Sequence, residues 1–218
     1  MNNILNILKL DFFTVKTSFS KIIMVYSISI LLGISAQPIV PVFLIMFFCV
    51  SFSGLTFSII EKNGCEKLYG ILPIHRREII TGRYLYGFIF GAVNLLISIL
   101  LAYITALFSK QQINTFALLL SITAAFCYYC FAVSISHPIY YKIGFSKSYM
   151  FITMPLYLLI LLIAFISEKT DFSETAGKVL QYFSDHYILL LFYGFILSIF
   201  MFIISAVISY GIFKNSEL

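Results

Sequence analysis

The residues best suited to chemistry in this chain gather in one short segment, 61–83, which reads EKNGCEKLYGILPIHRREIITGR. The segment holds eight of the 23 charged residues in a chain of 218. Apolar side chains, Leu68 and Tyr69 among them, lie between these charges. A surface that mixes apolar and basic groups is suited to binding another protein, so we expect this segment to contact a soluble partner. The alternative is that Arg76 and Arg77 hold lipid phosphates, and the two roles are compatible.

Catalytic chemistry is not indicated. The sequence contains no G-x-x-x-x-G-K-[ST] run to cradle nucleotide phosphates, so we expect no ATP hydrolysis by this chain alone. It also lacks H-E-x-x-H and G-x-S-x-G. His75 and His137 have no carboxylate pattern that indicates a metal, and we interpret both as satisfied interfacial histidines. Cys127 and Cys130 form a C-x-x-C within an apolar block, where packing is favoured over redox or metal chemistry. We predict no metal and no cofactor.

Composition places the chain in a membrane. Hydrophobic residues make up 61% of it, charged residues 11%, and the mean hydropathy is +1.02. Too few polar side chains remain to cover a soluble globule. Long continuous apolar blocks predict helices rather than the short alternating strands of a membrane barrel. We therefore expect one all-α membrane domain, 1–218, with six transmembrane helices at about 21–36, 38–60, 84–108, 115–136, 148–167 and 187–213.

Basic residues predict the orientation, because Lys and Arg accumulate in cytoplasmic loops. Grouping alternate loops puts eleven of the fourteen basic residues on one side, and only Lys110, Lys169 and Lys178 on the other. Both termini and segment 61–83 are therefore expected in the cytoplasm. The net charge of +5 follows from this bias and does not indicate nucleic-acid binding.

The first nineteen residues predict an amphipathic helix at the membrane surface. Apolar residues recur at spacings of three and four over 3–19, and polar residues including Lys9 and Lys16 lie largely opposite. We expect a bend near Ser18 to Lys21 before the first span. The alternative is a simple extension of that span. The apolar stripe consists of Ile4, Leu5, Leu8, Phe12, Val15 and Phe19.

Two spans carry stripes of small and polar residues at helical spacing. Such a stripe allows close helix packing, and it could instead line a translocation route, a reading that Asn94 favours. No acidic residue falls inside a predicted span, which disfavours ion-coupled transport. The stripes are Ser51, Gly54 and Ser58 in the second span, and Gly87, Gly91, Asn94, Ser98, Ala102 and Thr105 in the third.

The longest external loop, 168–186, has features of a short helix. Asp171 and Glu174 resemble a capping box, and one face beyond them is apolar. We expect this helix to cap the bundle, although it could instead lie on lipid.

Segment 61–83 resembles the corresponding loop of ABC-2 type permeases, the membrane subunits of bacterial ATP-binding-cassette exporters. That family has an acidic residue and an N-G pair after the second span, then L-P-[IV]-x-R-x-E-[IV] and a basic-aromatic start to the third span. The six spans, the N-terminal amphipathic helix and the helical loop before the sixth span extend the resemblance over nearly the whole chain. Here the motif reads Glu61, Asn63-Gly64, Leu72-Pro73-Ile74, Arg76, Glu78-Ile79 and Arg83-Tyr84.

The resemblance implies a permease in the bacterial cell membrane that exports its cargo by coupling to separate ATPase subunits, which bind ATP and Mg. It also implies pairing with a second copy or a related permease, and a coupling helix between spans two and three. An apolar interior favours amphipathic or hydrophobic cargo such as a peptide, an antimicrobial compound or a lipid. A non-transporting immunity or sensor protein is the alternative, and an intramembrane enzyme ranks last. The expected coupling residues are Glu61, Gly64, Leu68, Tyr69, Pro73, His75, Arg76, Arg77, Glu78, Lys142 and Lys147.

Overall fold

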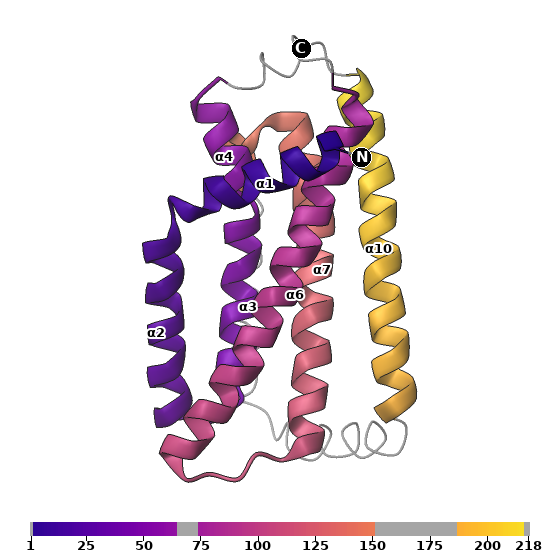
Figure 1. The fold of residues 1–218 in the computed structure, drawn as a ribbon. Coiled ribbons are helices and arrows are strands. Elements are labelled where there is room, and N and C mark those ends of the chain that lie inside the picture. The colour runs from indigo at the N-terminus through magenta and orange to yellow at the C-terminus, as the bar shows by residue number, and fades with distance from the viewer. Residues whose placement is uncertain (1, 65–73, 151–186, 216–218) are drawn as a thin grey trace.

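The computed structural model describes residues 2–64, 74–150 and 187–215, and the regular structure in these ranges is helical. The long helices run alongside one another as a bundle, and α1 (Asn2–Lys16) lies across one end of it (Figure 1). We refer to that end as the α1 end. The C-terminal end of α10 also lies there (Figure 1). The labelled helices are α1 (Asn2–Lys16), α2 (Phe19–Ser35), α3 (Val40–Ser53), α4 (Leu55–Lys62), α6 (Arg76–Ser109), α7 (Thr115–Ile143) and α10 (Tyr187–Asn215).

The described helices confirm an all-helical, multi-pass membrane protein. Four stretches are long and apolar enough to cross a membrane: Val40–Lys62, Arg76–Ser109, Thr115–Ile143 and Phe192–Lys214. The pair α1 and α2 counts as a fifth only if its 67° bend is ignored. Most of the predicted span 148–167 and the whole of loop 168–186 lie outside the described residues, so six spans remain a prediction.

The bend between α1 and α2 falls at Thr17 and Ser18, close to the predicted position. A straight extension of the first span is therefore not what the chain forms. The buried face of α1 differs from the predicted apolar stripe, because Ile7, Asp11 and Val15 point inward while Phe12 is exposed. The exposed apolar side of α1 is the side available to lipid.

The helix of the predicted fourth span does not end at Ser136, because α7 continues through Pro138 to Ile143. Proline has no N–H to donate to the carbonyl four residues earlier. In this helix that carbonyl belongs to Ser134, and the Ser205 hydroxyl of α10 donates to it at 2.6 Å. The neighbouring helix thus satisfies the freed group and allows α7 to continue. The expected loop from His137 to Ser148 shrinks to Gly144, because residues 145–150 are helical again.

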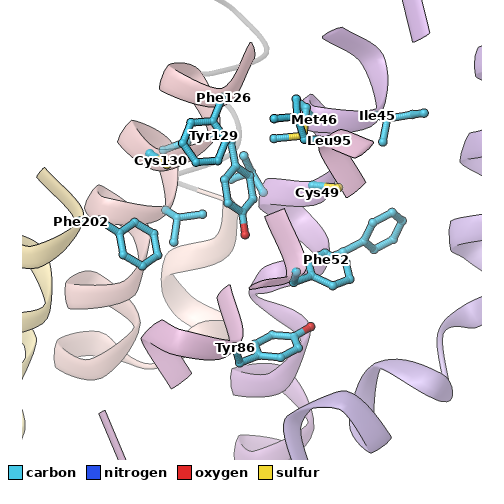
Figure 2. Packing of buried hydrophobic residues seen from close by; sticks show 14 of the residues in the cluster. Ile45, Met46, Cys49, Phe52, Tyr86, Leu95, Phe126, Tyr129, Cys130 and Phe202 are labelled. Carbon is cyan, nitrogen blue, oxygen red and sulfur yellow. The ribbon is translucent and has the colours of Figure 1, made fainter. Parts of the chain in front are cut away.

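Tyr129 of α7 forms the centre of the packing between α6 and α7 (Figure 2). Its hydroxyl donates to the Gly87 carbonyl at 2.6 Å, and its ring lies against Gly91. Cys49 and Cys130 are buried in the same apolar cluster, which suits the packing role expected of Cys130. Gly87, Gly91, Asn94 and Ser98 are all buried within this single chain. The α6 stripe therefore serves helix packing here, and a pathway role remains a prediction.

Gly91 and Gly87 provide a matched pair that tests this packing. A Cβ at Gly91 would lie 2.2 Å from Cε1 of Tyr129, whereas a Cβ at Gly87 would lie 3.5 Å from Cε1 of His137, an ordinary contact. We expect Gly91→Ala to lower the free energy of unfolding by about 1–3 kcal/mol through overpacking. Gly87→Ala is expected to be neutral or slightly stabilising, because alanine favours helix. Thermal unfolding in detergent measures both variants, and equal melting temperatures would contradict the packing described here.

Candidate functional site

Helix α1 rests on the first turns of α6, and successive contacts on both helices are about four residues apart. The Asn3 side chain donates to the Glu78 carboxylate at 3.0 Å. One turn further, Ile7 packs on Gly82, where a Cβ would come within 2.9 Å of the Ile7 side chain. The next turn of α6 brings Tyr86 against Phe12, with ring centroids 5.1 Å apart. A movement of α6 at this end must therefore carry α1 with it.

Glu78 joins α1 to the start of α6. Besides Asn3, its carboxylate accepts the backbone N–H of His75 at 3.1 Å. This reciprocal bond is one half of a capping box, which satisfies an N–H that the helix itself leaves open. His75 itself is exposed. Glu78, predicted to be a coupling residue, thus has a clear structural role in fixing where α6 begins.

Arg76 and Arg77 hold the C-terminal end of α10. The Arg76 guanidinium donates to the carbonyls of Phe213 at 2.9 Å and Lys214 at 2.7 Å. These carbonyls have no partner within their own helix, and the end of a helix dipole favours a cation. The Arg77 guanidinium lies 5.0 Å from the ring centroid of Tyr210. The arginine pair predicted to contact a partner or lipid phosphate therefore also connects α6 to α10.

Glu61 connects the second span to the region after α7. Its carboxylate accepts the backbone N–H of Ser146 at 2.9 Å, and Lys147 is close enough for its charge to act on the same group. A carboxylate is favoured at the N-terminal end of a helix such as 145–150. Gly144 permits this arrangement, because its φ of +90° is unfavourable for other residues. Two predicted coupling residues, Glu61 and Lys147, thus meet in space.

Arg83 is buried, with 5% of its surface exposed, at the centre of the α1 end. Its guanidinium carbon lies 4.7 Å from the ring centroid of Phe57 in α4 and 5.6 Å from that of Tyr141 in α7. His137 packs on the same Phe57 ring at 5.1 Å. Aromatic faces attract a cation strongly where water is excluded. Arg83 therefore links α6 to α4 and α7.

His137 differs from its predicted role. Only 1% of its surface is exposed, and neither ring nitrogen has a hydrogen-bond partner among the described residues. It is thus a buried packing residue, and the expectation of a satisfied interfacial histidine is wrong. The error follows from ending the fourth span too early, which placed His137 in a loop.

Asp11 is the most unusual residue of the site, since it is fully buried beneath α1. Neither carboxylate oxygen has a hydrogen-bond partner within the described part of the chain. Burial raises the pKa of Asp11 to about 6, and the positive charge of Arg83 opposes that rise. Asp11 was not among the residues predicted to be functional. The signal was its position four residues after Ile7 and four before Val15, which places an acid on the buried face of α1.

Some of the remaining predicted residues lie within the described part of the chain and some lie outside it. Gly64 ends the described segment after α4 with φ of +62°, as expected for a turn. Gly54 separates α3 from α4 and packs against Tyr140 and Phe145, with Ser58 buried and Ser51 half-buried nearby in sequence. Lys142 and Lys147 are exposed. The predicted residues Leu68, Tyr69 and Pro73 lie outside the described residues, as does the rest of 65–73 within segment 61–83.

Asp11 makes the docking of α1 depend on pH. Because the pKa of Asp11 is raised in the docked state, its ionised form opposes docking. The free-energy cost of burying the carboxylate is absent below about pH 4 and complete above about pH 6. A shift of about two pKa units corresponds to roughly 3 kcal/mol. We expect Asp11→Asn to slow backbone hydrogen exchange in residues 3–16 at pH 7.5, after correction for intrinsic rates. The native chain should approach the variant at pH 5. Faster exchange in Asp11→Asn would mean that attraction to Arg83 outweighs the cost of burial.

Comparison with known proteins agrees with the resemblance in segment 61–83. The family model described as ABC-2 family transporter protein matches residues 6–214. No curated protein and no solved structure matches the chain significantly. The family match covers most of α1, nearly all of α10 and the whole of the described helices between them. This chain therefore belongs to the ABC-2 family of transporter membrane proteins.

Proposed function

We propose that this chain is the permease subunit of an ATP-driven exporter, with its α1 end in the cytoplasm and separate ATPase subunits docked there. Family membership supports a transporter role. The charge distribution supports the orientation, since basic residues favour the cytoplasmic side. Lys9, Lys16, Lys62 and Lys142 all belong to the α1 end, whereas Lys110 ends α6 at the opposite end of the bundle.

The continuity of α6 is the observation that carries this proposal. The helix runs without a break for 34 residues from Arg76 to Ser109. A displacement applied to its first turn by a docked ATPase would pass directly into the membrane-spanning part, because a helix is stiff along its axis. Arg76 and Arg77 would pull on α10, Glu78 on α1, and Arg83 on α4 and α7.

A push from the ATPase would thus act on several helices together rather than on one loop. The packing of α6 on α7 at Tyr129 is close and leaves little room for adjustment within the chain. Rigid-body movement of the chain against an opposing permease half is therefore the expected response. That opposing half is a second copy or a related permease, and the pathway would lie between the halves.

The partner ATPase would bind ATP and Mg, and this chain would hold neither. Amphipathic or hydrophobic cargo fits best, because the buried polar groups of the described spans are mainly hydroxyls that bond to nearby carbonyls. Ser98 and Thr105 of α6 and Ser121 of α7 all donate to carbonyls of their own helix. Cargo with a strongly charged group would find few partners along such spans.

Lys142 is a suitable position at which to test ATPase docking, because it is exposed at the α1 end and lies in the last turn of α7. Arg76→Glu would be less informative, because it would also break the contacts to α10. We expect Lys142→Glu to weaken binding of the partner ATPase, identified by its co-purification with the native chain, by about three- to tenfold, as for a charge at the rim of an interface. Co-purification from gentle detergent and ATP hydrolysis by the complex measure the effect.

Lys110→Glu is the matched control, because Lys110 also ends a helix but lies at the opposite end of the bundle. It should leave both binding and hydrolysis unchanged. Equal effects of the two substitutions would contradict docking at the α1 end. Failure of the native chain to bind any cellular ATPase would contradict the exporter proposal and favour a non-transporting immunity or sensor protein.

A further inference from the structure

A groove of about 450 Å³ opens between α1, α2 and α6, and α1 lines it with Lys9, Phe13 and Lys16 among other residues. Its volume lies within the range of about 300–1,000 Å³ that is usual for ligand sites. The walls are largely apolar, with Phe13 and Phe19 from the bend and Val93 and Ile97 from α6. Phe13 and Phe19 are 69% and 58% exposed, so these rings are available to an apolar ligand.

The inner part of the groove has its polar groups satisfied. The Tyr26 hydroxyl of α2 donates to the Asn94 side-chain oxygen of α6. The Asn94 side-chain nitrogen donates to the Phe90 carbonyl at 2.8 Å. These polar atoms already have partners, so the inner groove does not need a polar ligand. A hydrocarbon chain fits such a surface better than a charged or strongly hydrated group.

The outer part of the groove is positively charged. Lys9 and Lys16 both line it and are exposed. They are seven residues apart on α1, which is about two turns and roughly 10 Å along the helix axis. The acid between them in sequence, Asp11, is buried on the other side of α1 and does not line the groove. The two lysines thus flank an apolar groove at the level where an interfacial helix meets lipid headgroups.

A ligand that fits both parts must carry an anion at one end and a hydrocarbon chain at the other. Inorganic phosphate would satisfy the lysines but leave the apolar walls unused, and a zwitterionic lipid would fill the groove without net charge complementarity. We propose that this groove binds one anionic phospholipid, with its headgroup phosphate between Lys9 and Lys16 and an acyl chain between α2 and α6. The bound lipid would hold the bend between α1 and α2 against α6. This proposal does not depend on ATPase docking.

Native mass spectrometry and thermal unfolding of the full chain in detergent test the site, with phosphatidylglycerol, phosphatidylcholine or inorganic phosphate added. We expect phosphatidylglycerol to bind and to raise the melting temperature more than phosphatidylcholine does. Lys9→Gln/Lys16→Gln should weaken phosphatidylglycerol binding by about 25-fold, at about fivefold per lysine. Lys62→Gln/Lys214→Gln removes the same charge from exposed positions outside the groove and should keep native affinity.

Val93→Trp tests the apolar part separately, because Val93 is 46% exposed and a larger side chain would fill the groove without changing charge. It should weaken phosphatidylglycerol binding while the melting temperature without lipid stays native. Equal binding of the two lipids, or native affinity in either groove variant, would overturn the proposal. So would a full effect of inorganic phosphate, which would indicate a free-anion site. A change of oligomeric state in Val93→Trp would assign the groove to a second copy of the chain instead.

Discussion

The burial of Arg83 is the constraint on which the α1 end depends. A guanidinium removed from water needs compensation, and here it comes from the faces of Phe57 and Tyr141 and from the nearby charge of Asp11. These groups belong to α4, α7 and α1, so compensating one charge requires three helices to meet on α6. The cation thus fixes the mutual positions of elements that are far apart in the sequence.

Burying Asp11 also costs free energy, because its carboxylate is removed from water without a hydrogen bond from the described residues. The attraction between the two charges offsets only part of the cost of removing the Asp11 carboxylate from water, so the pKa of Asp11 stays raised. At the start of α6, Arg76 binds the end of α10 and Glu78 binds α1, so these two helices are also attached to α6. Segment 76–83 is consequently the structural junction of the bundle. This suits the proposed role of a part that receives a push from an ATPase and passes movement into the membrane.

Much of this fold follows from the sequence, because long apolar blocks and a bend after a short amphipathic helix have few alternative structures in a membrane. The mixed charged and apolar character of segment 61–83 and its family resemblance could also be recognised from the sequence, because the motif residues lie close together in it. The continuation of α7 past Pro138 could not be predicted, because it depends on Ser205 of α10, far away in the sequence, donating to the Ser134 carbonyl. The Asp11 and Arg83 cluster was missed for the same reason: helical spacing places Asp11 on a face, but only tertiary packing determines what that face meets. Leu68, Tyr69 and Pro73 stay predictions.

Hydrogen exchange of Arg83→Met, measured at pH 7.5 beside the native chain, tests most directly whether one buried cation connects these helices. Methionine keeps an unbranched apolar side chain but removes the charge, so Asp11, Phe57 and Tyr141 lose their shared partner together. The account predicts faster exchange in three separate regions at once: residues 3–16 of α1, 55–62 of α4 and 137–143 of α7. Faster exchange confined to the first turns of α6, or native exchange throughout, would contradict it.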